Sequence, residues 1–245
     1  DVPRVGFPGS DILLVSGLAG GRADEPAIPV GRISVTSAGQ VSDYLDKVKQ
    51  YEHDSNGDQG WKKNVLHVNG GHSVGEITNF KNEFENFAKY VTNGTFGGKV
   101  IPFVKKGLIE VEDVDITPEV NEGVGMISYM GHGSQFITDV NFGYASLASR
   151  GYRNAGKYPL LYFNGCGVGN IFNGRLNTNL NAGDKMPLSL DWLLSKEKGA
   201  IAIIANSFES FTSPSVKYLD YLYKNLFSDK DQEVLTIGQI QQNAV

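Results

Sequence analysis

A cysteine and a histidine each follow an apolar segment of this chain. Cys166 is the single cysteine among the 245 residues, and it comes shortly after the apolar residues 158–163 (YPLLYF). His132 lies 34 positions earlier and comes shortly after residues 124–130 (VGMISYM). A thiolate is a strong nucleophile, and an imidazole can exchange a proton with it. These residue types therefore indicate covalent catalysis by cysteine with a histidine acid–base, provided that the fold brings both side chains together.

The apolar segments themselves predict such a fold. Continuous apolar runs are typical of strands that are buried on both faces of a parallel sheet. Further runs occur at 65–69 and 200–205, and segments with helical periodicity alternate with the runs. We therefore predict an α/β fold with a mostly parallel sheet and helices on both faces. Because the carboxyl ends of parallel strands share one edge of a sheet, His132 and Cys166 are expected to meet there.

Shorter signals complete the predicted order of elements. Short strands are expected at 12–15 and 29–35, and the strand at 99–104 is placed at an edge of the sheet because it contains Pro102. The run at 200–205 is expected to be fully buried, and residues 174–185 read as an Asn- and Gly-rich loop.

Each reactive residue also has a structural interpretation. A single cysteine can be a small buried hydrophobe, and a histidine after a strand can be a core residue held by hydrogen bonds. Glycines next to both residues favour catalysis, because Gly133, Gly165 and Gly167 let backbone N–H groups approach a substrate without a Cβ in the way. Of the other histidines, His67 is expected to be structural, whereas His72 could line the site.

Composition excludes several classes of function. The net charge is −5 and no basic stripe is visible, which argues against a nucleic-acid partner. The apolar runs are far shorter than the roughly 20 residues of a membrane helix. One cysteine cannot form an internal disulfide. The first residues show no signal peptide, and both ends are interpreted as cuts in a longer protein with further domains.

Four segments, in this order, resemble the gingipain family of the caspase–hemoglobinase class of cysteine peptidases. They are PVGR at 29–32, Gly75-Glu76, SYMGHGS at 128–134 and GAIAIIA at 199–205. Within that family, the short opening and the segment GRIS most resemble the gingipain-like sortase of the type IX secretion system. The resemblance implies a caspase-hemoglobinase-like α/β fold, an N-terminal subdomain part over about 1–95, and a catalytic subdomain over about 96–245.

The resemblance also implies roles for the reactive residues. Cys166 matches the nucleophile, His132 the acid–base, and Glu76 the third residue that orients the histidine. The backbone N–H groups of Gly133 and Cys166 match the oxyanion donors. Glu76 also has a simpler interpretation, because an acid near a helix N-terminus is stabilised by the helix dipole.

Substrate contacts are implied for Gly165, Ser134 and Phe211, the last as an aromatic wall of the specificity pocket. Proteolytic members of the family accept Arg or Lys and need an acid in that pocket. Asp139 and Glu209 are the two candidates for it.

No cofactor is required by this chemistry, although the resemblance allows a structural calcium ion. Asp54, Asn56 and Asp58 have the alternating oxygen spacing of a calcium loop, and a solvated turn explains the same residues.

The expected function is that of a cysteine endopeptidase acting on protein or peptide substrates through an acyl-enzyme, at the surface of or outside a bacterial cell. Hydrolysis and transpeptidation both remain open. The alternatives are a catalytically silent domain that binds protein partners and a non-proteolytic amidase with a cysteine nucleophile.

Overall fold

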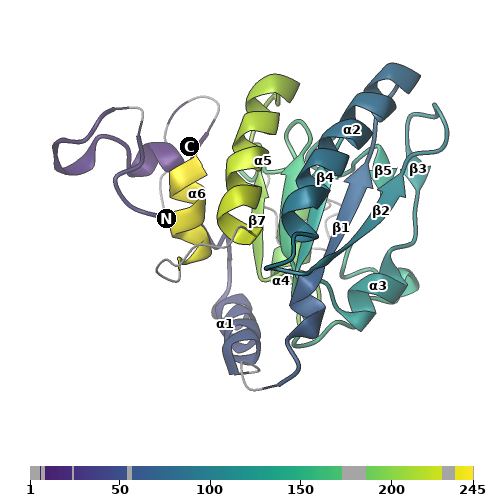
Figure 1. Cartoon of the computed structure of the whole chain (residues 1–245). Coiled ribbons are helices and arrows are strands. Elements are labelled where there is room, and N and C mark those ends of the chain that lie inside the picture. The colour runs from purple at the N-terminus through teal and green to yellow at the C-terminus, as the bar shows by residue number, and fades with distance from the viewer. Residues whose placement is uncertain are drawn as a thin grey trace.

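A five-stranded parallel sheet forms the centre of the molecule (Figure 1). The computed structural model describes Gly6 and residues 9–23, 25–53, 57–172, 186–227 and 235–244. The strands follow the order β2-β1-β4-β6-β7. Their bounds are β1 (Asn64–Asn69), β2 (Lys99–Val104), β4 (Met126–Met130), β6 (Leu160–Asn164) and β7 (Ala202–Ala205). A second, two-stranded parallel sheet joins β3 (Glu112–Asp113) to β5 (Val140–Asn141). The predicted parallel α/β architecture is confirmed.

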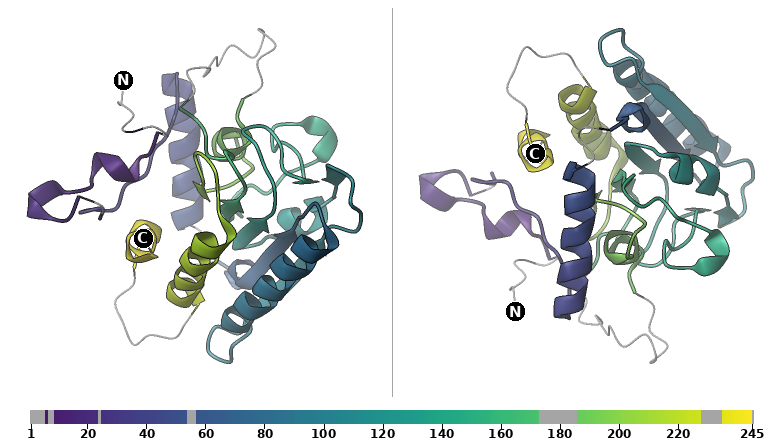
Figure 2. Two further views of the ribbon diagram at one scale, coloured as in Figure 1. Left: turned by 90° about the horizontal axis from the view of Figure 1, so that it is seen from above. Right: turned by 90° about the horizontal axis from the view of Figure 1, so that it is seen from below.

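Helices cover both faces of the main sheet (Figures 1 and 2). One face carries α2 (Val74–Val91) and α5 (Thr212–Phe227), with α6 (Ile237–Ala244) beside α5. The other face carries α3 (Thr117–Glu122) and α4 (Leu188–Leu194), and α1 (Ala38–His53) packs on α4. The 3₁₀ helices are η1 (Ile12–Leu14), η2 (Leu18–Gly20), η4 (Gly60–Lys63) and η5 (Ala148–Arg150). In the described part of the chain, no helix combines the length and apolar character needed to cross a membrane.

Strand β4 shows why its sequence is apolar throughout. Ile127 and Tyr129 point into the core beneath α3 and α4, whereas Met126 and Met130 belong to the core beneath α2 and α5. All four side chains are at most 2 % exposed, because alternate residues of a strand point to opposite faces and both faces are covered.

The strand register places the predicted reactive residues at one edge. Met130 of β4 pairs with Asn164 of β6, and the Gly131 N–H continues the ladder by donating to the Asn164 carbonyl at 3.1 Å. His132 and Cys166 each lie two residues beyond this last pair, so both leave the sheet at its carboxyl edge. The strand order reverses between β1 and β4, next to this pair, because the chain passes from β1 to β2 on one side and then to β4 on the other side of β1. Such a switch point is where open α/β sheets bind their ligands.

Several predicted elements differ in the structure. Residues 12–14 form η1 instead of a strand, and 29–35 form no strand. A strand needs a neighbouring strand to pair with its backbone groups. Neither segment pairs with the edge strand β7, whose only described partner strand is β6. Strand β7 is half-buried instead of fully buried because it lies at the edge. Strand β2 lies at the opposite edge, as the proline indicated. The loop predicted at 174–185 lies outside the described residues.

The predicted boundary near residue 95 falls inside the main sheet. Strand β1 precedes it and β2 follows it, yet the two pair along their whole length from Asn64↔Lys99 to Asn69↔Val104.

A buried lysine joins α1 to the rest of the molecule. Lys47 is 1 % exposed, and its Nζ donates to the carbonyls of Leu193 at 3.0 Å, Ser195 at 3.3 Å and Lys198 at 2.8 Å. Carbonyls at the end of a helix lack partners within the helix, so this amine satisfies groups at and just beyond the end of α4. Burial lowers the pKa of Lys47 to about 7.

Candidate active site

Cys166 lies on the turn that follows β6, and the segment after β7 holds this turn in place. The N–H of Gly167 donates to the Phe208 carbonyl at 2.7 Å. Gly167 has a φ of +66°, a conformation that glycine adopts without steric cost. Half-buried Cys166 accepts a hydrogen bond at its Sγ from the Ser210 N–H at 3.5 Å, and the Ser210 hydroxyl lies 3.8 Å away. An N–H directed at sulfur stabilises negative charge on it, which a nucleophilic thiolate needs.

The turn that carries His132 touches the turn that carries Cys166. A Cβ added to Gly133 would lie 2.8 Å from Val168 Cγ2, 3.4 Å from Gly165 Cα and 3.6 Å from the Cys166 carbonyl oxygen. Gly165 is buried and contributes to this close approach, and its contact with a substrate stays a prediction. The absence of side chains at both glycines therefore lets the two reactive turns pack directly against each other.

Two backbone N–H groups near the thiol have no partner in the described part of the chain. The N–H of Gly133 and the N–H of Cys166 donate no hydrogen bond to any described residue. Donors that are fixed in position and unpaired are suited to stabilise an oxyanion.

His132 is paired with a carboxylate from the neighbouring strand–helix connection. Its Nε2 lies 3.2 Å from Glu76 Oε2. Glu76 is in the first turn of α2, where the capping Ser73 Oγ accepts from the Glu76 N–H at 3.2 Å. The carboxylate also accepts the His72 N–H at 2.7 Å. Glu76 thus has both the helix-start role and the contact with His132 that were foreseen as alternatives.

The charge of Glu76 is stabilised by these contacts. The hydrogen bond from the His72 backbone lowers the pKa of Glu76, desolvation opposes this, and His132 lowers it further. The carboxylate is therefore ionised at neutral pH and can accept a hydrogen bond from an N–H of the His132 ring.

Asp139 is not the acid of a substrate pocket, contrary to one of the two predictions for that acid. It is 3 % exposed, and its oxygens accept the Gly71 N–H at 2.7 Å, Lys105 Nζ at 3.3 Å and the Tyr129 hydroxyl. A carboxylate committed to so many buried partners is structural.

A cavity of about 580 Å³ borders the segment that contacts Cys166. Its lining includes Glu209, Ser210 and Phe211, and the stacked rings of Tyr162 and Tyr218, whose centroids are 5.9 Å apart. Phe211 is 64 % exposed, which leaves its ring free to contact a ligand. The predicted Phe211 wall and Glu209 thus lie at one cavity.

The predicted substrate contact Ser134 does not belong to that cavity. It is exposed on the turn after His132, where its N–H donates to the Ile137 carbonyl at 2.8 Å.

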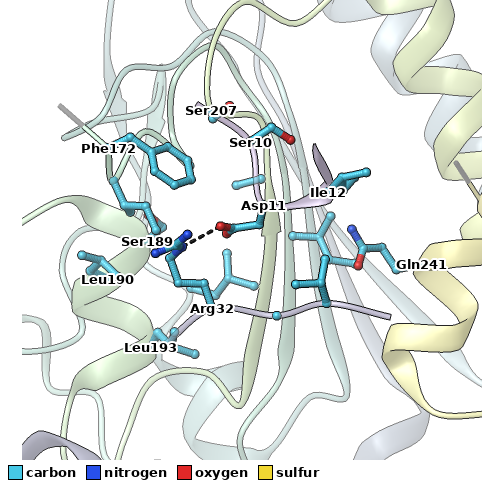
Figure 3. Close-up of a pocket in the computed structure, with 17 residues that line it drawn as sticks. Ser10, Asp11, Ile12, Arg32, Phe172, Ser189, Leu190, Leu193, Ser207 and Gln241 are labelled. Carbon is cyan, nitrogen blue, oxygen red and sulfur yellow. Dashed lines mark hydrogen bonds and ion pairs between the residues drawn. The ribbon is translucent and has the colours of Figure 1, made fainter. Parts of the chain in front are cut away.

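Gly31 and Arg32 line a smaller cavity of about 200 Å³ (Figure 3). Arg32 Nε lies 2.6 Å from Asp11 Oδ1, and the guanidinium faces the Phe172 ring at 5.4 Å. The lining also includes residues 203–205 of strand β7. These side chains attach the N-terminal segment to the edge of the sheet, which the sequence did not indicate.

The calcium prediction cannot be followed through the fold. Asp54 and Asn56 lie outside the described residues, and Asp58 Oδ1 accepts the Gly60 N–H at 2.8 Å. Within the described ranges, no three His, Cys, Asp or Glu side chains gather as a metal site.

Comparison with known proteins places this geometry in a family. The model of peptidase family C25 matches residues 2–245. The structure resembles that of the Arg-specific cysteine proteinase gingipain R (RgpB), with a TM-score of 0.76 and 18 % identity over 100 % of this chain and 55 % of that one. It also resembles the complex of the Porphyromonas gingivalis RgpB pro- and mature domains, with a TM-score of 0.75 and 17 % identity over 100 % of this chain and 56 % of that one.

A third structure, described only as a protease, has a TM-score of 0.58 and 20 % identity over 75 % of this chain and 37 % of its own. No curated protein matches the chain. The chain spans about half the length of the two RgpB chains, 55 % and 56 %. These structures share the caspase-hemoglobinase-like fold foreseen from the sequence, and the family match covers nearly every residue. The chain therefore belongs to peptidase family C25, the gingipain family.

Proposed function

We propose that this protein is a cysteine endopeptidase in which Cys166 and His132 form the reactive pair. The observation that carries the proposal is the packing of Gly133 against Gly165 and the Cys166 carbonyl at the edge shared by β4 and β6. Membership of a peptidase family supports the same reaction class.

The proposed reaction uses the two nitrogens of His132 differently. Nε2–H donates to the Glu76 carboxylate, which leaves the Nδ1 lone pair to take the thiol proton. The Cys166 sulfur then attacks the peptide carbonyl carbon, and the carbonyl π electrons move onto oxygen. When the tetrahedral intermediate collapses, the C–N bond breaks and His132 returns the proton to the leaving amine. The products of this half-reaction are the free amine and a thioester on Cys166.

The oxyanion of the intermediate would be held by the N–H groups of Gly133 and Cys166. Neither group donates to another described residue, so neither has to break a bond in order to bind the oxyanion. One such donor typically contributes about 3–4 kcal/mol to transition-state stabilisation.

The acyl group can leave in two ways. Water at the thioester gives hydrolysis, and an amine gives transpeptidation, which is the reaction of a sortase. The resemblance to the sortase of the type IX secretion system suggests an extracellular or cell-surface location and makes transpeptidation a route to test beside hydrolysis. Incubating the enzyme with a cleavable peptide and an amine nucleophile separates the routes, because only transpeptidation gives an amide product in excess of free acid.

Substrate side chains are proposed to enter the cavity beside Ser210. Glu209 is the carboxylate that this cavity offers to a basic side chain. Replacing Glu209 with Gln should lower kcat/KM for substrates with Arg or Lys before the cleaved bond and leave substrates with apolar residues there unchanged. Equal effects on both substrate sets would rule out this role of Glu209.

The decisive experiment treats a diverse peptide mixture with the wild type, Cys166→Ala and His132→Ala, and identifies new termini by mass spectrometry. We expect cleavage by the wild type and none above background by the variants, with circular dichroism showing that all three are folded. A peptidyl chloromethyl ketone should label Cys166 in the wild type. Neither cleavage nor labelling with any peptide under reducing conditions would favour the silent, partner-binding domain.

A further inference from the structure

His72 lies face to face with His132 at the candidate site. The ring centroids are 4.0 Å apart and the planes differ by 8°. Both side chains are 43 % exposed. An exposed side chain on a turn normally samples several rotamers, and fixing it costs conformational entropy. The parallel contact therefore needs a cause in the surrounding structure.

Two hydrogen bonds and a bend that requires glycine fix the backbone around His72. The His72 N–H donates to Glu76 Oε2, the same oxygen that lies near His132 Nε2. The preceding Gly71 N–H donates to Asp139 Oδ2 at 2.7 Å. Gly71 has a φ of +133°, and a Cβ there would lie 2.8 Å from the Ile77 backbone nitrogen, so the bend requires glycine.

Asp139 connects the turn of His72 to the turn of His132. Its own N–H donates to the His132 carbonyl at 2.9 Å, while its carboxylate holds Gly71 and lies 3.8 Å from His72 Nε2. Lys105, directly after β2, and the hydroxyl of Tyr129 in β4 contact the same buried carboxylate. One residue that the proposed reaction does not use thus links the two turns that carry the imidazoles.

A single hydrogen bond does not fix the orientation of an imidazole. The contact of His132 Nε2 with Glu76 defines one direction, and the His132 ring can still turn about that axis. A second ring stacked on its face removes this rotation. The two constraints together define where Nδ1 points, and Nδ1 is the atom that must reach the thiol of Cys166.

We propose that His72 is a positioning residue whose ring acts as a platform for His132. The inference rests on the peptidase function proposed above. It assigns the effect to the flat ring and not to a proton on His72, so an uncharged aromatic ring should replace it.

The test compares His72→Ala and His72→Phe with the wild type, using a peptide that the wild type cleaves. The control is His53→Ala, at the exposed end of α1. We expect His72→Ala to lower kcat roughly 10- to 100-fold with KM nearly unchanged, because misplacement by about 1 Å has effects of this size. His72→Phe should recover most of the lost kcat, and His53→Ala should behave as the wild type.

A second measurement does not depend on activity. The chain has four histidines, so the ring protons of His132 can be assigned by NMR. They should show a ring-current shift in the wild type and in His72→Phe that disappears in His72→Ala.

Three results would overturn the inference: wild-type kcat in His72→Ala, a loss in His72→Phe equal to that in His72→Ala, or His132 shifts that do not change in His72→Ala. A wild type that shows the ring-current shift but cleaves no peptide would instead refute the proposed peptidase function. The catalytic role of His72 would then fall with it, although the stacking itself would stand.

Discussion

Replacing Gly133 with alanine should force apart the two turns that carry His132 and Cys166. Gly133 does not have a positive φ, so alanine is acceptable to the backbone and the effect is purely steric. The new Cβ would lie 2.8 Å from Val168 Cγ2, whereas carbon atoms in contact prefer about 3.5–4.0 Å. The turns must therefore separate by roughly 1 Å.

Val168 cannot easily move away to make room. It is 0 % exposed, its branched side chain has few rotamers, and its carbonyl accepts the Ser189 hydroxyl at 2.8 Å. Overpacking of this kind costs about 1–3 kcal/mol of unfolding free energy. A displacement of this size between nucleophile and base can lower kcat by about 10²-fold.

Val168→Ala provides the matched test, because it removes the atom that the new methyl group meets. Alone it should cost about 2–3 kcal/mol for the lost methyl groups and the cavity. In the double variant the methyl group introduced at position 133 fills part of that cavity. The double variant should therefore lose at least about 1 kcal/mol less unfolding free energy than the sum of the losses in the two single variants. Urea unfolding of the four proteins and kcat on one peptide measure the cycle. Strict additivity in stability, together with no recovery of kcat, would show that the turns do not meet as described.

Three further predictions address the anchor of α1, the core and the orienting acid. Lys47→Met should lower the unfolding free energy by about 2–4 kcal/mol by leaving buried carbonyls unpaired, whereas Lys49→Met, whose ion pair is exposed, should change it by less than about 0.5 kcal/mol in urea titrations. Burial lowers the pKa of His67 to about 3, so the unfolded chain binds the extra proton between pH 6.5 and 3. Stability should fall there by up to about 1.4 kcal/mol per pH unit on acidification, and a His67→Gln variant that lacks this pH dependence would support the assignment. Glu76→Gln should lower kcat roughly 10- to 100-fold, and Glu85→Gln on the same helix should not; equal values for the two variants would remove Glu76 from the site.

The sequence was most informative where both faces of a strand are buried. The runs before His132 and Cys166 had to be internal parallel strands, and their register then follows from the sheet. It was least informative where an apolar run is short. Residues 12–15 have the composition of a strand but form a 3₁₀ turn, because their backbone has no strand to pair with among the described residues. Hydrophobicity alone does not separate these cases.

The candidate site divides in a similar way. Cys166 and His132 were visible because each follows a recognisable apolar run, whereas Glu76 was suggested by the resemblance to the gingipain family. The stacking of His72 and the role of Asp139 were not visible, because both depend on how two turns fold back on each other across 68 residues, from Gly71 to Asp139. The sequence alone does not show whether an acid such as Asp139 faces a substrate or accepts hydrogen bonds from buried groups.

The parallel pairing of all strands in the main sheet also affects when the candidate site forms during folding. Glu76 and His132 are 56 residues apart, and Cys166 meets Ser210 across 44. Parallel neighbours cannot pair until a whole crossover has closed, which makes such sheets slow to assemble. In a ribosome-bound or partly collapsed chain, Cys166 would not yet lie near His132, its proposed partner. The pair of side chains proposed for catalysis would therefore come together only when the sheet is complete.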